Sequence, residues 1–246
     1  MWKILAIILL GWALGLLVNY LADVLPVRRR FVHPICTYCY EDMAWRNYLL
    51  WPRKCPHCWQ RRPWRAWLVE GLAIAATIWV WLSPPQKLGF WPGLALLVYF
   101  AVVMVIDIEY RLILHPVSIF GAVGGLVLGV WLHGSSATFF GGLAGFGIML
   151  GLYYLGALFA RWMSRRRGQP LQEVALGFGD VNLAGVLGLI LGWPGIAAGL
   201  IIAILLGGFF SLFYVIYLLV RRQFRAFIAI PYGPFLILAA FFLLYL

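Results

Sequence analysis

Two aspartates lie at the ends of apolar runs. Burying a carboxylate there is energetically unfavourable, so such a residue usually has a function. Asp107 follows the apolar run 90–106, and Asp180 precedes the run 181–192. Acidic groups in a membrane usually face a protein interior or a water-filled cavity. Two such carboxylates can form an acid–base pair, in which one takes a proton from water and its protonated partner donates to a substrate carbonyl. The pair therefore suggests a protease.

Two glycines precede the second aspartate in the sequence Gly-Phe-Gly-Asp. Gly177 and Gly179 would let the backbone bend and come close to a bound peptide. This suits a protease that binds its substrate in an extended conformation. The alternative is that Asp180 only caps a helix and Asp107 only marks the membrane boundary.

Four other acids compete with this assignment or support it. Glu70 lies one turn inside an apolar run, where it could pair with an arginine, shape the site or bind substrate. Glu109 is a rival for the role of Asp107. Asp23 has arginines nearby as partners, and Glu173 suits a solvated salt bridge in a basic loop.

The cysteines form a second group with chemical potential. They follow the pattern C-x2-C-x15-C-x2-C within the polar residues 27–65, at Cys36, Cys39, Cys55 and Cys58. Two such knuckles can present four thiolates to one zinc ion, with no position left open for water, so the expected role is structural. His57 is not needed as a ligand. The alternatives are a redox dithiol pair or four unrelated buried cysteines.

The composition indicates which elements must position these groups. Apolar residues make up 64% of the 246 and charged residues only 11%, with a mean hydropathy of +0.93, which is typical of an all-α polytopic membrane protein. About eight transmembrane helices are expected, with the small cytoplasmic zinc domain between the first and the second. The predicted spans are 2–25, 67–82, 90–106, 117–132, 137–160, 180–192, 196–220 and 227–246.

The charge distribution predicts an orientation in the membrane. Residues 26–66, 107–116, 161–179 and 221–226 carry 17 of the 19 lysines and arginines, so this side is expected to be cytoplasmic. Both proposed catalytic aspartates would then lie at the cytoplasmic face. The same pattern accounts for the net charge of +11 and argues against nucleic-acid binding. The expected domains are the first helix (1–26), the zinc domain (27–65) and a seven-helix core (66–246).

Six stretches, in order along nearly the whole chain, resemble the bacterial prepilin peptidases, also called type IV prepilin leader peptidases. They are residues 15–26, the paired cysteine knuckles, and residues 65–70, 106–113, 177–183 and 230–235. The resemblance implies an aspartic protease of the GxGD type, with Asp107 and Asp180 as catalytic residues and the four cysteines as zinc ligands. The residues implied to shape the substrate site are Gly177, Gly179, Glu70, Glu109 and Asn182.

The family cleaves the short basic leader from pilin-like precursors, after a glycine, at the cytoplasmic face of the bacterial inner membrane. The implied partners are type IV prepilins or the pseudopilins of type II secretion, together with the lipid bilayer. Many members also methylate the new N-terminus, which implies S-adenosylmethionine as a cofactor where that activity is present. Asn182 departs from the family, which usually has lysine two residues after its second aspartate.

Two other function classes compete with the peptidase. An ion-coupled transporter would use intramembrane acids as relays. Here, however, the acids gather at one face, and the chain has no repeated half. A catalytically inactive scaffold for pilus or secretion assembly is the other alternative, and the change at Asn182 keeps it open.

Overall fold

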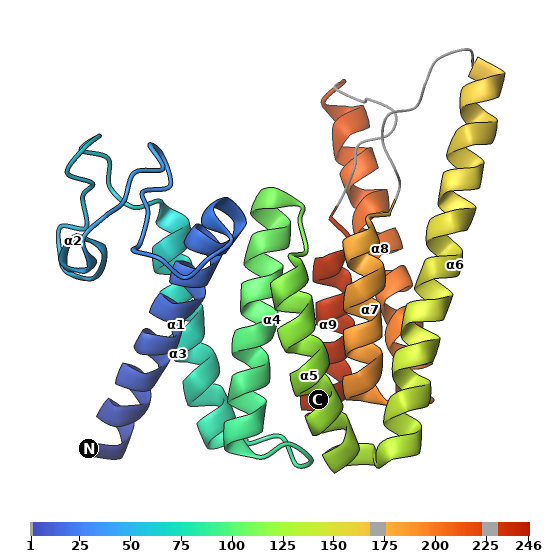
Figure 1. Cartoon of the computed structure of the whole chain (residues 1–246), viewed down its shortest axis with the longest axis horizontal. Helices are drawn as coiled ribbons and strands as arrows, with labels where there is room; N and C mark the ends of the chain where they lie inside the picture. The colour runs from blue at the N-terminus through green and yellow to red at the C-terminus, as the bar shows by residue number, and fades with distance from the viewer. Residues whose placement is uncertain (1, 168–175, 223–230) are drawn as a thin grey trace. The chain divides into compact units, whose positions relative to one another are not determined.

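The chain folds into α-helices joined by short connections and one longer polar segment. The computed structural model describes residues 2–167, 176–222 and 231–246. Among these residues, six helices are long and apolar enough to cross a membrane: α1 (Trp2–Arg28), α3 (Trp64–Leu82), α4 (Phe90–Tyr110), α5 (His115–His133), α6 (Ser135–Arg167) and α8 (Gly195–Val220). Two shorter apolar helices are α7 (Phe178–Leu191) and α9 (Gly233–Tyr245), and a single turn forms α2 (Trp45–Leu49) (Figure 1).

The helices expose apolar side chains to an extent that water would not tolerate. On α8, for example, Ile201, Leu205 and Phe209 are 59–66% exposed. Large contiguous apolar surfaces of this kind need an apolar environment, which lipid provides. The expected all-α, multi-pass membrane architecture is confirmed, with six helices of spanning length and two shorter ones.

The chain divides into two compact units, the first ending at Tyr110 and the second beginning at Arg111. In the first unit, α1, α3 and α4 pack against one another. Glycine allows the closest approach between α1 and α3, because a Cβ at Gly15 would lie only 2.7 Å from the Cα of Glu70. The cysteine-containing polar segment connects α1 to α3 and belongs to this unit.

The second unit is arranged around α7, which contacts α5, α6, α8 and α9. Five of its apolar side chains are at most 1% exposed: Val181, Leu183, Ala184, Leu187 and Ile190. The contact with α6 depends on small residues, since a Cβ on Gly145 would collide with the carbonyl oxygen of Ala184. Small residues are what allow helix backbones to approach closely inside a membrane.

Several helices extend beyond the apolar runs that predicted them. The run 90–106 predicts a helix ending before Asp107, but α4 continues to Tyr110, so Asp107 lies inside the helix. Hydropathy records where polar residues begin, whereas a helix ends where its backbone hydrogen bonds stop. The C-terminal span was expected from residue 227, and α9 begins at Gly233; residues 223–230 lie outside the described chain.

Candidate functional site

The four cysteines converge on one point in the polar segment. Their Sγ atoms all lie within 4.8 Å of one another, with Cys36 to Cys58 at 3.6 Å and Cys39 to Cys55 at 3.7 Å. A tetrahedral ion with zinc–sulfur bonds of about 2.3 Å places its sulfur atoms about 3.8 Å apart, whereas a disulfide requires about 2.05 Å. The cysteines are therefore positioned to bind a single metal ion, and the arrangement is consistent with structural zinc.

The same loop builds each half of this metal site. In both loops the N–H of the first cysteine, Cys36 or Cys55, donates to the carbonyl five residues later, at 2.9 and 3.0 Å respectively. The residue after the second cysteine is Tyr40 in one loop and Trp59 in the other, and both adopt a φ of 58°. The two loops are thus structural copies that present their sulfur atoms to a shared centre.

The duplication extends into the helices that follow the loops. Residues 34–49 and 53–68 share the pattern Cys-x2-Cys-aromatic, then Trp-Arg-x-aromatic-Leu, at constant spacing. Accordingly, α2 begins at Trp45 and α3 begins at Trp64. The knuckles were predicted from the cysteines alone. The longer repeat was missed, although it can be read directly from the sequence.

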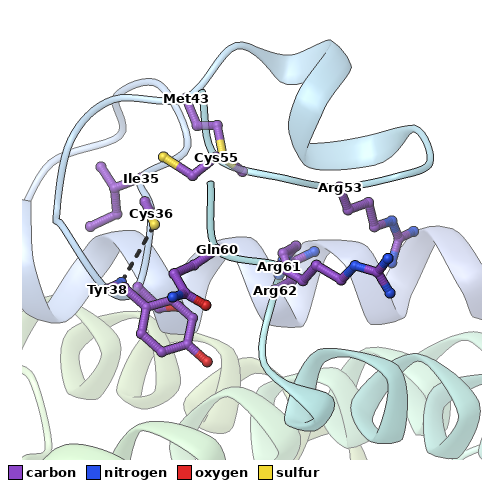
Figure 2. A pocket seen from close by; sticks show the side chains of 10 residues that line it. Ile35, Cys36, Tyr38, Met43, Arg53, Cys55, Gln60, Arg61 and Arg62 are labelled. Carbon is purple, nitrogen blue, oxygen red and sulfur yellow. Dashed lines mark hydrogen bonds between the residues drawn. The ribbon is translucent and has the colours of Figure 1, made fainter. Parts of the chain in front are cut away.

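The thiols differ in acidity because their surroundings differ. Figure 2 shows Cys36 accepting a hydrogen bond from the backbone N–H of Tyr38, at 3.5 Å. Burial nevertheless raises the pKa of Cys36 to about 12. Burial also acts against the thiolate of Cys55, but backbone hydrogen bonds from Cys58 and His57 outweigh it and lower the pKa to about 7. Metal binding needs all four thiolates, so it would release protons.

Glu70 lies in a buried ion-pair network rather than in an open pocket. Its side chain is 5% exposed, and Nη1 of Arg53 lies 2.8 and 3.0 Å from its two carboxylate oxygens. The indole Nε1 of Trp12 donates to it at 3.2 Å, and Nη1 of Arg62 lies 3.8 Å away. Glu70 was expected to pair with an arginine, shape the site or bind substrate, and the structure shows the ion pair with an arginine. This contact connects the second knuckle to α3.

Asp23 forms the other centre of this network. Its carboxylate accepts hydrogen bonds from Tyr48 Oη at 2.7 Å and Arg62 Nη2 at 3.0 Å, and Arg65 is a third partner. Burial and the charge of Asp23 raise the pKa of Tyr48, so the phenol stays protonated as a donor. The arginines next to Asp23 in sequence were expected as its partners. Instead, residues distant along the chain pair with it, while Arg28 contacts Asp42.

The last turn of α4 carries two acids in different environments. Glu109 is a third exposed and forms an ion pair with Nε of Arg65 at 2.9 Å. Asp107 is 4% exposed. Residues two positions apart on a helix point to different faces, so the two carboxylates do not share a site. The ion pair with Arg65 gives Glu109 a structural role at the end of α4.

Asp180 lies in the first turn of α7 and is 8% exposed. Its Oδ2 accepts a hydrogen bond from the N–H of Gly177 at 3.1 Å, so the carboxylate does cap its helix. Gly177 has an ordinary φ of −79°. Gly179 has a packing role, because a Cβ there would lie 2.9 Å from the Cβ of Ile113.

A comparison with known protein families found a match for the segment that contains α7 and the helices before it. Residues 94–212 match the type IV leader peptidase family. This segment of the chain is therefore similar to that family. It begins in α4 and ends in α8, so it contains both Asp107 and Asp180, and the match supports an aspartic leader peptidase. Comparisons with curated proteins and with solved structures gave no significant match.

Two further residues lie close to the leader peptidase motifs. Asn182 lines an apolar groove between α5, α6 and α7, together with Ser118 and Phe146. Tyr232 follows the matched segment, and burial together with the charge of Asp180 raises its pKa to about 12. Its phenol is therefore protonated and lies within electrostatic reach of Asp180. The sequence includes Tyr232 in a family-like motif but gives it no role, because only folding brings it near Asp180.

Proposed function

We propose that the protein is a GxGD-type aspartic endopeptidase that removes the basic leader from type IV pilin-like precursors at the cytoplasmic face of the bacterial inner membrane. The match of residues 94–212 to the leader peptidase family carries this proposal, because the matched segment includes both acidic motifs. Glycine at 177 and 179, with Asn182 on the next turn, would shape the substrate site beside Asp180.

Asp107 and Asp180 would act as the acid–base pair that activates water. One carboxylate, ionised, takes a proton from water as the oxygen attacks the scissile carbonyl, and the other, protonated, donates to the carbonyl oxygen. Collapse of the tetrahedral adduct breaks the C–N bond and returns a proton to the leaving amine. The helix N-terminus stabilises negative charge on Asp180, so we assign it the ionised role and Asp107 the protonated one.

We further propose that Cys36, Cys39, Cys55 and Cys58 hold zinc as a structural ion. Their sulfur spacing fits four-coordinate zinc, and four thiolates leave no position for a reacting water. Methylation of the new N-terminus from S-adenosylmethionine is a second proposed step. It would use a site separate from the aspartates, because methyl transfer needs bound S-adenosylmethionine rather than an activated water.

Co-expression with a pilin precursor tests the reaction directly. We expect the intact mass of the pilin to decrease by the leader and, where methyl transfer occurs, to increase by one methyl group. A precursor whose glycine before the cleavage site is replaced by a bulky residue should remain uncut. A wild-type precursor that keeps its full mass beside well-folded, membrane-inserted enzyme would favour the scaffold alternative instead.

A further inference from the structure

A pocket rich in arginine and tryptophan lies beside the start of α3. Its lining residues are Trp51, Pro52, Arg53, Arg61, Arg62 and Trp67. The rings of Trp51 and Trp67 have centroids 6.1 Å apart. The guanidinium of Arg53 lies 4.5 Å from the centre of the Trp67 ring, and that of Arg61 lies 5.8 Å from the Trp51 ring. Three cations thus meet an aromatic pair in one concave surface.

The arginines of the pocket carry positive charge and hydrogen-bond donors that the neighbouring acidic side chains do not use. Figure 2 shows Arg53 and Arg62 extending from loop segments of the second knuckle. Both lie within ion-pair distance of Glu70. The Nη1 of Arg62 is nevertheless buried with no hydrogen-bond partner among the described residues. Arg61 is exposed and makes no ion pair within the described parts of the chain. An anion would complete this set of contacts.

The position of the pocket along the fold points to the surface of the bilayer. Trp67 lies in the first turn of α3, one of the membrane-length helices, and Trp51 lies in the polar segment that precedes it. Both side chains are exposed, Trp51 by 72% and Trp67 by 47%. Tryptophan at the end of a spanning helix sits at the level of the lipid headgroups. Phosphate is the anion present at that depth in every phospholipid bilayer.

We infer that this pocket binds the phosphate of an anionic phospholipid headgroup. Arg61 and Nη1 of Arg62 would hold the phosphate, and the two tryptophans would lie along the glycerol and upper acyl region. A basic leader peptide would be repelled by the same arginines, so the pocket is distinct from a leader site. The bound lipid would connect the second knuckle to α3 at the membrane surface, independently of peptidase activity.

Native mass spectrometry of the purified full chain in neutral detergent tests this binding. The protein would be offered equal amounts of dioleoylphosphatidylglycerol and dioleoylphosphatidylcholine. We expect preferential retention of phosphatidylglycerol, and we expect Arg61→Gln to weaken it about fivefold, the contribution of one arginine near an anionic headgroup. Trp51→Ala should also reduce retention.

Matched variants distinguish lipid binding in the pocket from a general effect of surface arginines and tryptophans. Arg46→Gln removes an exposed arginine of the same polar segment, and Trp59→Ala removes a tryptophan that is 75% exposed, both outside the pocket lining. Both should retain phosphatidylglycerol like the wild type, and zinc content would report folding of every variant. Equal retention of the two lipids, an equal effect of Arg61→Gln and Arg46→Gln, or displacement of the lipid by excess inorganic phosphate would each overturn the inference.

Discussion

Each of the two units of this protein is stabilised internally by a different kind of interaction. In the first, six buried or partly buried charged side chains, with Asp23 and Glu70 among them, form a network of ion pairs beside a four-cysteine centre. In the second, α7 is enclosed by apolar side chains and glycine contacts, such as that between Gly145 and Ala184. One unit depends on specific partners and the other on close packing, although each contributes one of the two proposed catalytic aspartates.

This difference indicates where each unit is vulnerable. A polar segment shorter than about 40 residues has too little core to fold alone, so it depends on metal and ion pairs. Closely packed membrane helices depend instead on the absence of side-chain atoms at their contact points. Substitutions that are severe in one unit should therefore leave the other intact, and the predictions below test this separation.

The largest effect should come from the metal site. Replacing both Cys36 and Cys55 with Ser should abolish zinc binding and unfold the polar segment, since structural zinc contributes on the order of 10 kcal/mol to folding. Elemental analysis should find about one zinc per wild-type chain and none in the variant. Limited proteolysis should cut the polar segment while the second unit resists.

A change at His57 provides the matched control for the metal site. It lies in the second knuckle, is exposed and is absent from the sulfur cluster. His57→Ala should keep the zinc and the protease resistance. Normal folding of the double cysteine variant without any metal would show that the polar segment does not need metal to fold.

Next in size is the loss of the buried ion pair at Glu70. Glu70→Gln keeps the shape of the side chain but leaves Arg53 without its counter-charge, and breaking a buried pair costs about 3–5 kcal/mol. The thermal unfolding midpoint of the purified protein should decrease clearly. Asp42→Asn is the control, because its ion pair with Arg28 is exposed and such pairs contribute at most about 1 kcal/mol. Equal effects of the two changes would contradict the buried network.

A smaller effect is expected from crowding the second unit. Gly145→Ala places a Cβ against the carbonyl oxygen of Ala184, and overpacking of this kind costs about 1–3 kcal/mol. Gly147→Ala, two residues away, meets nothing within 4 Å and should be nearly neutral. Thermal unfolding should separate the two variants, and both should retain their zinc. Equal thermal unfolding midpoints for the two variants would show that α6 and α7 can move apart to accommodate the added methyl group at no cost.

The sequence predicted the elements better than it predicted the contacts between them. Apolar runs located the eight apolar helices because hydropathy is a local property, and cysteine spacing located the metal centre because both knuckles are local loops. The partners of Asp23 and Glu70 could not be predicted, since Arg62 and Arg53 reach them only after the polar segment folds. The same holds for Tyr232 beside Asp180, which long intervening helices separate along the chain.

The assignment of the two aspartates as the catalytic pair remains the central proposal, and one measurement tests it most directly. Purified Asp107→Asn, Asp180→Asn and Glu109→Gln variants, each checked for zinc content, would be mixed with a pilin precursor and cleavage followed by mass. Asparagine keeps the shape of the acid but cannot exchange its proton. Both aspartate variants should therefore leave the precursor uncut, while Glu109→Gln still cleaves it. Full cleavage by either Asp→Asn variant would remove that aspartate from the mechanism.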